Sequence, residues 1–138
     1  MERDAISPPD RCDDPADAPF WEAIDRGELV LARCTGCGTH YPRSQACTAC
    51  GAGAQALEWV PASGRGTIRT FAVFHRAYDP FFAPLVPYNV AVVTLEEGAE
   101  LLTNVVGCRN GELTVGMRVR IVIRDRGGRN IHQAEAAG

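Results

Sequence analysis

Four cysteines stand in two short pairs, and their spacing constrains the fold more than any other feature of the chain. Cys34 and Cys37 form one Cys-x2-Cys pair, and Cys47 and Cys50 form a second pair after nine intervening residues. Two residues between the cysteines let both sulfurs of a pair point to one centre, and a glycine after each pair relieves the backbone of the turn. Four soft ligands in a tetrahedron suit Zn²⁺. The sequence therefore predicts a structural zinc ribbon with no open position for a substrate water.

Two other interpretations of these cysteines stay open at this point. Iron can occupy the same four sulfurs, as in rubredoxin. Two disulfides are the second alternative, although paired turns are typical of metal sites and no secretory signal precedes them. Residues 1–18 are acidic and rich in proline, so we expect a flexible arm and neither a signal peptide nor a transit peptide. A cytoplasmic, reducing location in a bacterium follows as an expectation.

The charged residues exclude some chemistry and weaken the case for nucleic acid. All 14 basic residues are arginine, so no lysine is present to form a Schiff base or to act as a general base. Residues 1–64 hold five arginines and ten carboxylates, whereas residues 65–138 hold nine arginines and seven carboxylates. The net charge of −3 argues against a protein whose affinity comes from neutralising phosphates. Hydrophobic residues make up 46%, which is enough for a core in a chain of 138 residues.

The pattern along the chain predicts a helix, then the ribbon, then a barrel. Residues 17–27 read as a short helix with Asp17 as its cap, and residues 28–33 as a strand leading into the first cysteine pair. From Ser63 onward the pattern is that of strands, expected at 67–74, 88–95, 100–106, 118–124 and 130–134. Five strands with these turns fit an OB-fold, a five-stranded Greek-key barrel. We therefore expect a mainly β protein with an acidic arm (1–18), a helix and rubredoxin-like zinc ribbon (19–60) and an OB-fold barrel (61–138).

An ordered set of motifs makes the chain similar to a known family. The motifs are Phe20-Trp21 before the Gly-Glu-Leu-Val of 27–30, the cysteine pairs, Tyr-Pro-Arg at 41–43, Ser-Gly-Arg-Gly-Thr-Ile at 63–68, Pro-Tyr-Asn-Val-Ala-Val-Val at 87–93 and Leu-Thr-Val-Gly-Met-Arg-Val at 113–119. In this set the chain resembles the two-part zinc-ribbon and OB-fold proteins long filed as a domain of unknown function (number thirty-five) and associated with acyl-CoA metabolism. The resemblance runs from about Pro19 to about Ala134.

The resemblance implies an accessory role, with no catalysis by this chain alone. Members of the family stand beside thiolases, thiolase-like lipid-transfer proteins that act as aldolases, and hydratases of the hot-dog fold. The implied partner is a thiolase-like enzyme in a hetero-oligomer, acting on a bulky acyl-CoA. In bacterial steroid side-chain breakdown such an enzyme performs retro-aldol cleavage of a 3-hydroxyacyl-CoA. The chain would be a stand-alone member or a domain separated from a larger hydratase subunit.

Candidate interface residues lie in two apolar segments. The loop 75–87 joins two expected barrel strands and carries several apolar and aromatic residues among three prolines, which suggests contact with another surface or a lid on the barrel. Phe20 and Trp21 either pack onto their own domain or cap a partner. Neither His75 nor Tyr78 is fixed by sequence on one face with Asp79, so an acid–base set there is weak. The interface candidates are Phe20, Trp21, His75, Tyr78, Phe81, Phe82 and Leu85.

Other residues carry alternatives that the sequence leaves open. Arg65, Arg69 and Arg76 are candidate contacts for the phosphates of CoA, or they belong to solvated faces of the barrel. A single-stranded nucleic-acid-binding module is the alternative function, because OB-folds with aromatic side chains bind single strands; here those side chains would be Phe71, Phe74 and Tyr88. We expect His40 at the surface of the ribbon, Tyr41 and Pro42 packed over the metal site, Cys12 free, and Cys108 a small buried residue.

Overall fold

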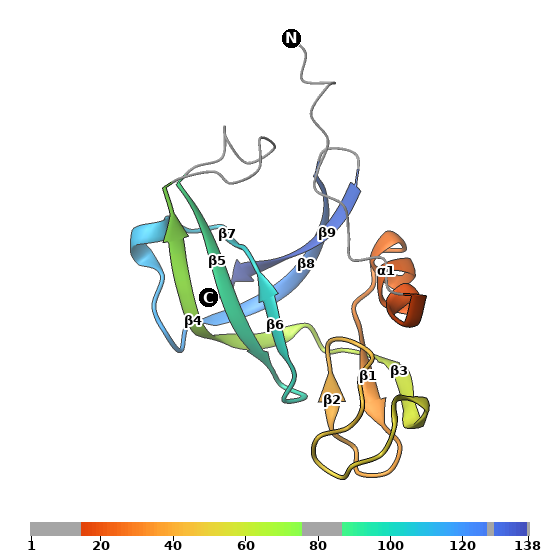
Figure 1. Ribbon diagram of the computed structural model, residues 1–138. Helices are drawn as coiled ribbons and strands as arrows, with labels where there is room; N and C mark the ends of the chain where they lie inside the picture. The colour runs from red at the N-terminus through yellow and green to blue at the C-terminus, as the bar shows by residue number, and fades with distance from the viewer. Residues whose placement is uncertain (1–14, 76–86, 127–128, 138) are drawn as a thin grey trace.

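The computed structural model describes residues 15–75, 87–126 and 129–137, which form two β-sheets and one helix that contacts both. A small sheet has the strand order β2-β1-β3, and a larger one has the order β6-β5-β4-β8-β9-β7. Figure 1 shows the small sheet below the curved larger sheet, with α1 beside both. None of the helices in these residue ranges has the length and apolar character needed to cross a membrane.

The helix α1 (Ala18–Asp25) is shorter than predicted, and Asp17 does not cap it. A 3-10 turn at Pro15–Asp17 precedes the helix, and the side chain of Asp17 makes no capping hydrogen bond. After the helix, Gly27 adopts a left-handed φ of +84°, which favours glycine. Phe20 and Ile24, four residues apart on one face, are 1% and 0% exposed. The apolar face of α1 is therefore buried within the protein's own core.

The ribbon sheet is built around β1 (Val30–Cys34). It pairs with β2 (His40–Tyr41) on one side and with β3 (Leu57–Pro61) on the other. A 3-10 turn at Ala54–Ala56 leads into β3. Strand β3 was not predicted, because a five-residue strand that ends at proline carries little alternation. Its pairing of Leu57 with Cys34 places the return of the chain beside the first cysteine.

The barrel strands follow the alternation that the sequence showed. Its elements are β4 (Arg65–Phe74), β5 (Tyr88–Leu95), β6 (Glu100–Thr103), β7 (Val105–Val106), a 3-10 turn at Asn110–Glu112, β8 (Arg118–Arg126) and β9 (Arg129–Ala136). Along β5 every second side chain is buried, as expected for a strand with one face in the core. The turn into β6 contains Gly98 at a φ of +97°. The β5–β6 hairpin predicted for this segment is present.

Within the described residues the barrel sheet has six strands, which corrects the expected count of five. Asn104 interrupts the single strand expected at 100–106, because its backbone oxygen accepts a hydrogen bond from the amide of Ala134 at 2.7 Å. The side-chain amide of Asn104 also donates to the backbone oxygen of Asn89. The chain therefore changes its pairing partner at Asn104: β6 pairs with β5, whereas β7 pairs with β9 in a parallel pair. This switch brings the two ends of the sheet together and makes the barrel.

One apolar core runs through the helix, the ribbon and the barrel. It joins Phe20 and Ile24 of α1 and Leu31 of β1 to the inward residues of the barrel strands. A side-chain amide of Asn130 in β9 also lies 3.3 Å from the backbone oxygens of Ile24 and Asp25. The helix is thus the joint between the ribbon and the barrel. The buried barrel residues of this core are Ile68, Ala91, Val93, Leu95, Ala99, Leu101, Val105, Leu113, Val119 and Ala134.

Candidate metal centre and its surroundings

The two cysteine turns are built by the same hydrogen bonds. The amide of Cys34 donates to the backbone oxygen of Thr39, and the amide of Cys47 donates to that of Ala52, each at 2.8 Å. Gly38 and Gly51 close the turns by donating to the backbone oxygens of Cys34 and Cys47, at 2.7 and 2.9 Å. Both glycines have a φ of +83°. The glycine after each pair therefore adopts a left-handed conformation that would be strained for a residue with a side chain.

The four sulfurs are placed for a metal ion. The Sγ atoms of Cys34 and Cys50 lie 3.7 Å apart, those of Cys37 and Cys47 lie 3.5 Å apart, and all four lie within 4.8 Å of one another. A tetrahedral ion with Zn–S bonds of about 2.3 Å separates its sulfurs by about 3.8 Å. A disulfide would bring two sulfurs to about 2.05 Å. The four cysteines are free and positioned to bind a metal ion, so the disulfide alternative does not hold.

Hydrogen bonds lower the pKa of two of the thiols and raise the pKa of a third. The hydroxyl of Tyr41 donates to Cys47 Sγ at 3.3 Å and lowers the pKa of Cys47 to about 6. Hydrogen bonding with Thr39, whose Oγ1 lies 3.2 Å from Cys37 Sγ, lowers the pKa of Cys37. At Cys50 the backbone N–H of Ala52 lowers the pKa, but hydrogen bonds with the other three cysteines outweigh it and raise the pKa to about 12. Four neighbouring thiolates therefore need a cation, which a bound metal supplies.

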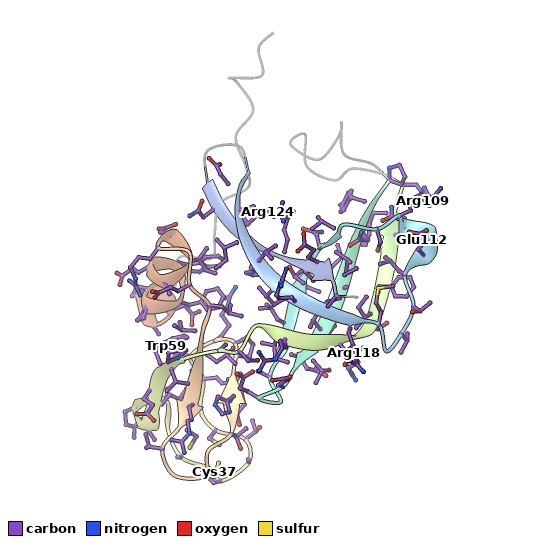
Figure 2. All side chains as sticks on the ribbon, turned by 180° about the vertical axis from the view of Figure 1, so that it is seen from behind. Cys37, Trp59, Arg109, Glu112, Arg118 and Arg124 are labelled. Carbon is purple, nitrogen blue, oxygen red and sulfur yellow. The ribbon has the colours of Figure 1, made fainter. Side chains whose placement is uncertain are left out.

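The metal centre lies at the end of the ribbon away from the barrel, where Figure 2 labels Cys37. An ion bound by all four sulfurs would join the two turns. Four ligands fill a tetrahedral coordination shell, so no open coordination position would remain. His40 is not one of the four ligands; it lies in β2, opposite Arg33. Tyr41, predicted to pack over the site, contacts it through its hydroxyl.

Asp17 connects the ribbon to the helix, a role that no sequence pattern predicted. Its buried carboxylate accepts the backbone amide of Ser44 at 2.8 Å and pairs with Arg43 at 3.3 Å. The Arg43 guanidinium also lies 5.9 Å from the ring centroid of Trp21, over its face. The segment that leads into Cys47 is therefore anchored at the start of α1.

His132 of β9 completes this joint from the side of the barrel. Its ring stacks on Trp21 at 6.4 Å between centroids and meets the ring of Phe20 edge-on at 6.0 Å. Its Nδ1 lies 3.0 Å from Thr103 Oγ1. Burial, reinforced by the positive charge of Arg43, lowers the pKa of His132 to about 4. His132 is therefore neutral at pH 7 and acts as an aromatic packing residue.

The structure separates the predicted interface residues. Phe20 is 1% exposed in the core, which favours the alternative that it packs onto its own domain. Trp21 is partly buried and packs against the core, and His75 is exposed at the end of β4. The remaining candidates of this segment, Tyr78, Asp79, Phe81, Phe82 and Leu85, lie outside the described residues, as do Arg76 and Cys12.

The candidate phosphate contacts already have carboxylate partners. Arg65 pairs with Glu96 at 3.0 Å, and Arg69 pairs with Glu100 at 3.1 Å. Hydrogen bonding to Glu96 raises the pKa of Arg65, and the same contact lowers the pKa of Glu96. These pairs favour the alternative of solvated barrel faces for both arginines. Cys108 is partly buried against the core, as expected for a small packing residue.

The aromatic residues considered for nucleic acid form no open stacking platform. Phe71 packs against the core, whereas Phe74 and Tyr88 stack on each other at 5.3 Å between centroids. Single-strand binders offer aromatic faces to successive bases. The mutual stacking of Phe74 and Tyr88 occupies one face of each ring.

Comparison with known proteins places the chain in a family. A family model described as the ChsH2 rubredoxin-like zinc ribbon domain matches residues 21–57, and one described as the ChsH2 C-terminal OB-fold domain matches residues 59–124. A DUF35 domain-containing scaffold protein of Methanocaldococcus jannaschii is 34% identical over 106 residues, covering 75% of this chain and 74% of that protein. This chain belongs to the DUF35 family. Its zinc ribbon and OB-fold follow the order of the ChsH2 domains.

Other relatives of this DUF35 protein are larger or belong to a complex. A probable enoyl-CoA hydratase alpha subunit of Thermomonospora curvata is 37% identical over 75% of this chain. The 3-oxo-4,17-pregnadiene-20-carboxyl-CoA hydratase alpha subunit of Mycobacterium tuberculosis is 30% identical over 77% of this chain. The chain spans about a third of these two subunits, 32% and 33% of their lengths. A solved structure named Ltp2-ChsH2(DUF35) aldolase matches with a TM-score of 0.78 and 31% identity, covering 93% of this chain and 100% of that chain.

Proposed function

We propose that this DUF35 protein is a non-catalytic accessory subunit that binds and supports a thiolase-like enzyme acting on a bulky acyl-CoA. The observation that carries this proposal is the likeness to the chain of the Ltp2-ChsH2(DUF35) aldolase, which extends over 93% of this chain and all of that one. A likeness of this extent covers the ribbon, the helix and the barrel together. The scaffold name of the archaeal relative supports the same role.

The metal centre has a structural role in this proposal, and we propose Zn²⁺ as its ion. The four sulfurs fit a tetrahedral ion, and Leu31 is the one described residue of the ribbon strands that belongs to the buried core cluster. When bound, zinc supplies charge neutralisation and fixed geometry at the thiolates. The residues of this chain then hold a rigid ribbon against α1 through Asp17 and Arg43. Iron is the alternative ion, and metal analysis of the purified protein distinguishes the two.

The finer part of the proposal is the reaction of the partner. The names of the relatives point to an aldolase and to a steroid acyl-CoA hydratase. Retro-aldol cleavage of a 3-hydroxyacyl-CoA breaks the bond between the α and β carbons. The β carbon becomes a carbonyl as its hydroxyl loses a proton, and the α carbon of the shortened acyl-CoA gains one. The partner would carry the groups that move these protons, and this chain would complete or stabilise its substrate channel.

Co-purification followed by an activity assay tests the proposal. A thiolase-like protein that co-purifies with this chain is expressed alone and with it, and cleavage of a steroid side-chain 3-hydroxyacyl-CoA is followed by release of the shortened acyl-CoA. We expect a stable complex and an activity that is lost when this chain is absent. A partner that binds nothing and is equally active alone would overturn the accessory role. A complex that is active on another acyl-CoA would retain the role and change the substrate.

A further inference from the structure

Arginines alternate along the outer face of β8. Arg118, Arg120 and Arg124 are exposed, whereas Val119 is buried and Ile121 packs against the core. Alternate residues of a strand lie on opposite faces, so the three arginines share the face of β8 that points away from the core. Figure 2 labels Arg118 and Arg124 toward opposite ends of the strand. At about 3.3 Å per residue, this β8 arginine row is about 20 Å long.

The arginines of the β8 arginine row outnumber the carboxylates that pair with them. Glu135 of β9 is shared, because its Oε1 pairs with Arg120 at 3.1 Å and its Oε2 pairs with Arg124 at 3.0 Å. Arg118 has no ion pair with any residue that the structure describes. Three positive charges therefore face one negative charge, a local excess of two. In the rest of the described structure, each ion-paired arginine has a carboxylate of its own, in the pairs Arg26–Glu28, Arg33–Glu58, Arg43–Asp17, Arg65–Glu96, Arg69–Glu100 and Arg109–Glu112.

The register of the sheet adds a repulsion to this excess. Arg120 lies directly opposite Arg65 of β4 in the antiparallel pair. Like charges at directly opposed positions destabilise a sheet. Exposed arginines are not needed to fill the core, so the folding of the barrel gives no reason for this arrangement. An acidic surface placed over β8 would neutralise the excess and relieve the repulsion.

We propose that the β8 arginine row docks an acidic protein surface, and that the thiolase-like partner supplies it. The inference rests on the proposed function and names the surface that would carry it. Carboxylates suit the row because Glu135 already bridges two of its guanidinium groups. A row of about 20 Å matches a line of acidic side chains on a protein better than one phosphate group. Single-stranded nucleic acid would need aromatic faces beside the row, but Phe74 and Tyr88 stack on each other at the far end of β4.

Charge reversal in the full zinc-loaded chain tests the docking surface. Binding to the partner that co-purifies is measured at 50 and 300 mM NaCl for the wild type, for Arg118→Glu with Arg120→Glu, and for Arg109→Glu. Arg109 is the control, because it lies outside β8 in the sequence and its side chain is 89% exposed. We expect the double reversal to weaken binding about 10- to 100-fold at 50 mM NaCl, mainly through slower association, and the control to change binding less than about 3-fold. Glu135→Gln, which adds to the positive excess, should speed association.

The outcomes separate this inference from the proposed function. If the complex forms and the double reversal binds as tightly as the wild type, the β8 arginine row is not the docking surface, whereas the accessory role stands. If the wild type forms no complex, the proposed function fails and this inference fails with it. Binding of a 20-nucleotide oligothymidine or of free CoA that the double reversal abolishes, with partner affinity unchanged, would assign the row to that ligand and overturn the inference. Unchanged circular dichroism and zinc content show that the variants are folded.

Discussion

The ribbon and the barrel reach a fixed structure by different physical means. Among the residues that the structure describes, the barrel buries ten apolar residues in the core cluster. In the ribbon, the buried cysteines Cys34 and Cys47 lie in turns whose other two cysteines are exposed. A metal ion that joins four sulfurs replaces the apolar core that the ribbon is too small to build. Stability of the ribbon should therefore depend on metal, and stability of the barrel on packing.

The joint between the two regions combines apolar packing with hydrogen bonding. Phe20 packs into the shared core, whereas Asp17 binds the ribbon segment before Cys47 through hydrogen bonds. Figure 1 shows α1 beside the small sheet and near β9. A change at the metal centre should lower the local stability of α1 more than that of the barrel.

Metal removal should have the largest effect and should separate the two regions. Chelation, or Cys47→Ser, is expected to abolish the protection of amides in β1 and β3 from hydrogen exchange, because four thiols cannot replace the ion that joins them. Amides in the centre of β4 and β5 should stay protected. Exchange measured residue by residue by nuclear magnetic resonance checks this. Cys108→Ser is the control cysteine outside the metal centre. Equal loss of protection in β5 and β1 would mean that the two regions unfold as one unit.

Truncation of Phe20 should have the next largest effect, because it empties the joint. Phe20→Ala is expected to lower the free energy of unfolding of the zinc-loaded protein by about 3–5 kcal/mol, the usual cost for a buried phenylalanine. Urea denaturation followed by circular dichroism measures it. Phe74→Ala is the matched control: Phe74 is only partly buried and stacks with Tyr88. We expect the control to cost about 1 kcal/mol. Equal costs would show that the shared core does not carry the joint.

Local patterns in the sequence predicted the elements whose cause is local. The spacing of four cysteines, each pair followed by glycine, was enough for the ribbon. The alternation in residues 88–95 was enough for β5, which begins and ends at the predicted residues. In both cases neighbouring residues supply the geometry, so the sequence alone carries the information. Phe20 shows the limit: an apolar helix face predicts burial, but it does not say whether the chain itself or a partner covers that face.

Features that depend on distant residues were not predictable in the same way. Asp17 was predicted to cap its own helix, yet its carboxylate binds Ser44, 27 residues away. The change of pairing partner between β6 and β7 depends on hydrogen bonds that join Asn104 to Ala134 and Asn89. These residues are too far apart in the sequence for a local pattern to reveal the contacts. No role was predicted for His132, because its ring contacts with Phe20 and Trp21 form only when α1 packs on β9. The unequal sharing of carboxylates along β8 likewise became visible only with the register of β9.

Acid should weaken the joint through His132. Burial lowers its pKa from 6.5 to about 4 in the folded protein, so the unfolded chain binds a proton first as the pH falls. The stability contributed by neutral His132 is therefore complete above pH 6.5 and is lost progressively between pH 6.5 and 4. The loss is on the order of 3 kcal/mol.

Comparison with His132→Asn isolates this contribution from the acid sensitivity of the cysteine site. Both proteins lose metal ligation in acid, but only the wild type carries the imidazole. Urea denaturation at pH 7, 6, 5 and 4 should give a difference in unfolding free energy that shrinks as the pH falls. A difference that stays constant over this range would show that His132 takes up its proton equally in both states.

The smallest effect, at Asp17, asks which part of its contact matters. Asp17→Ala removes the acceptor of the Ser44 amide and should cost about 1–3 kcal/mol, because a buried donor is left without its partner. Asp17→Asn keeps an oxygen for that amide and loses only the charge beside Arg43. It should cost less than about 1 kcal/mol, since the Arg43 side chain is 43% exposed and water can solvate it. Urea denaturation of both zinc-loaded variants measures the two costs. If the asparagine variant is as unstable as the alanine variant, the ion pair fastens the ribbon to the helix; if only alanine destabilises, the backbone hydrogen bond does.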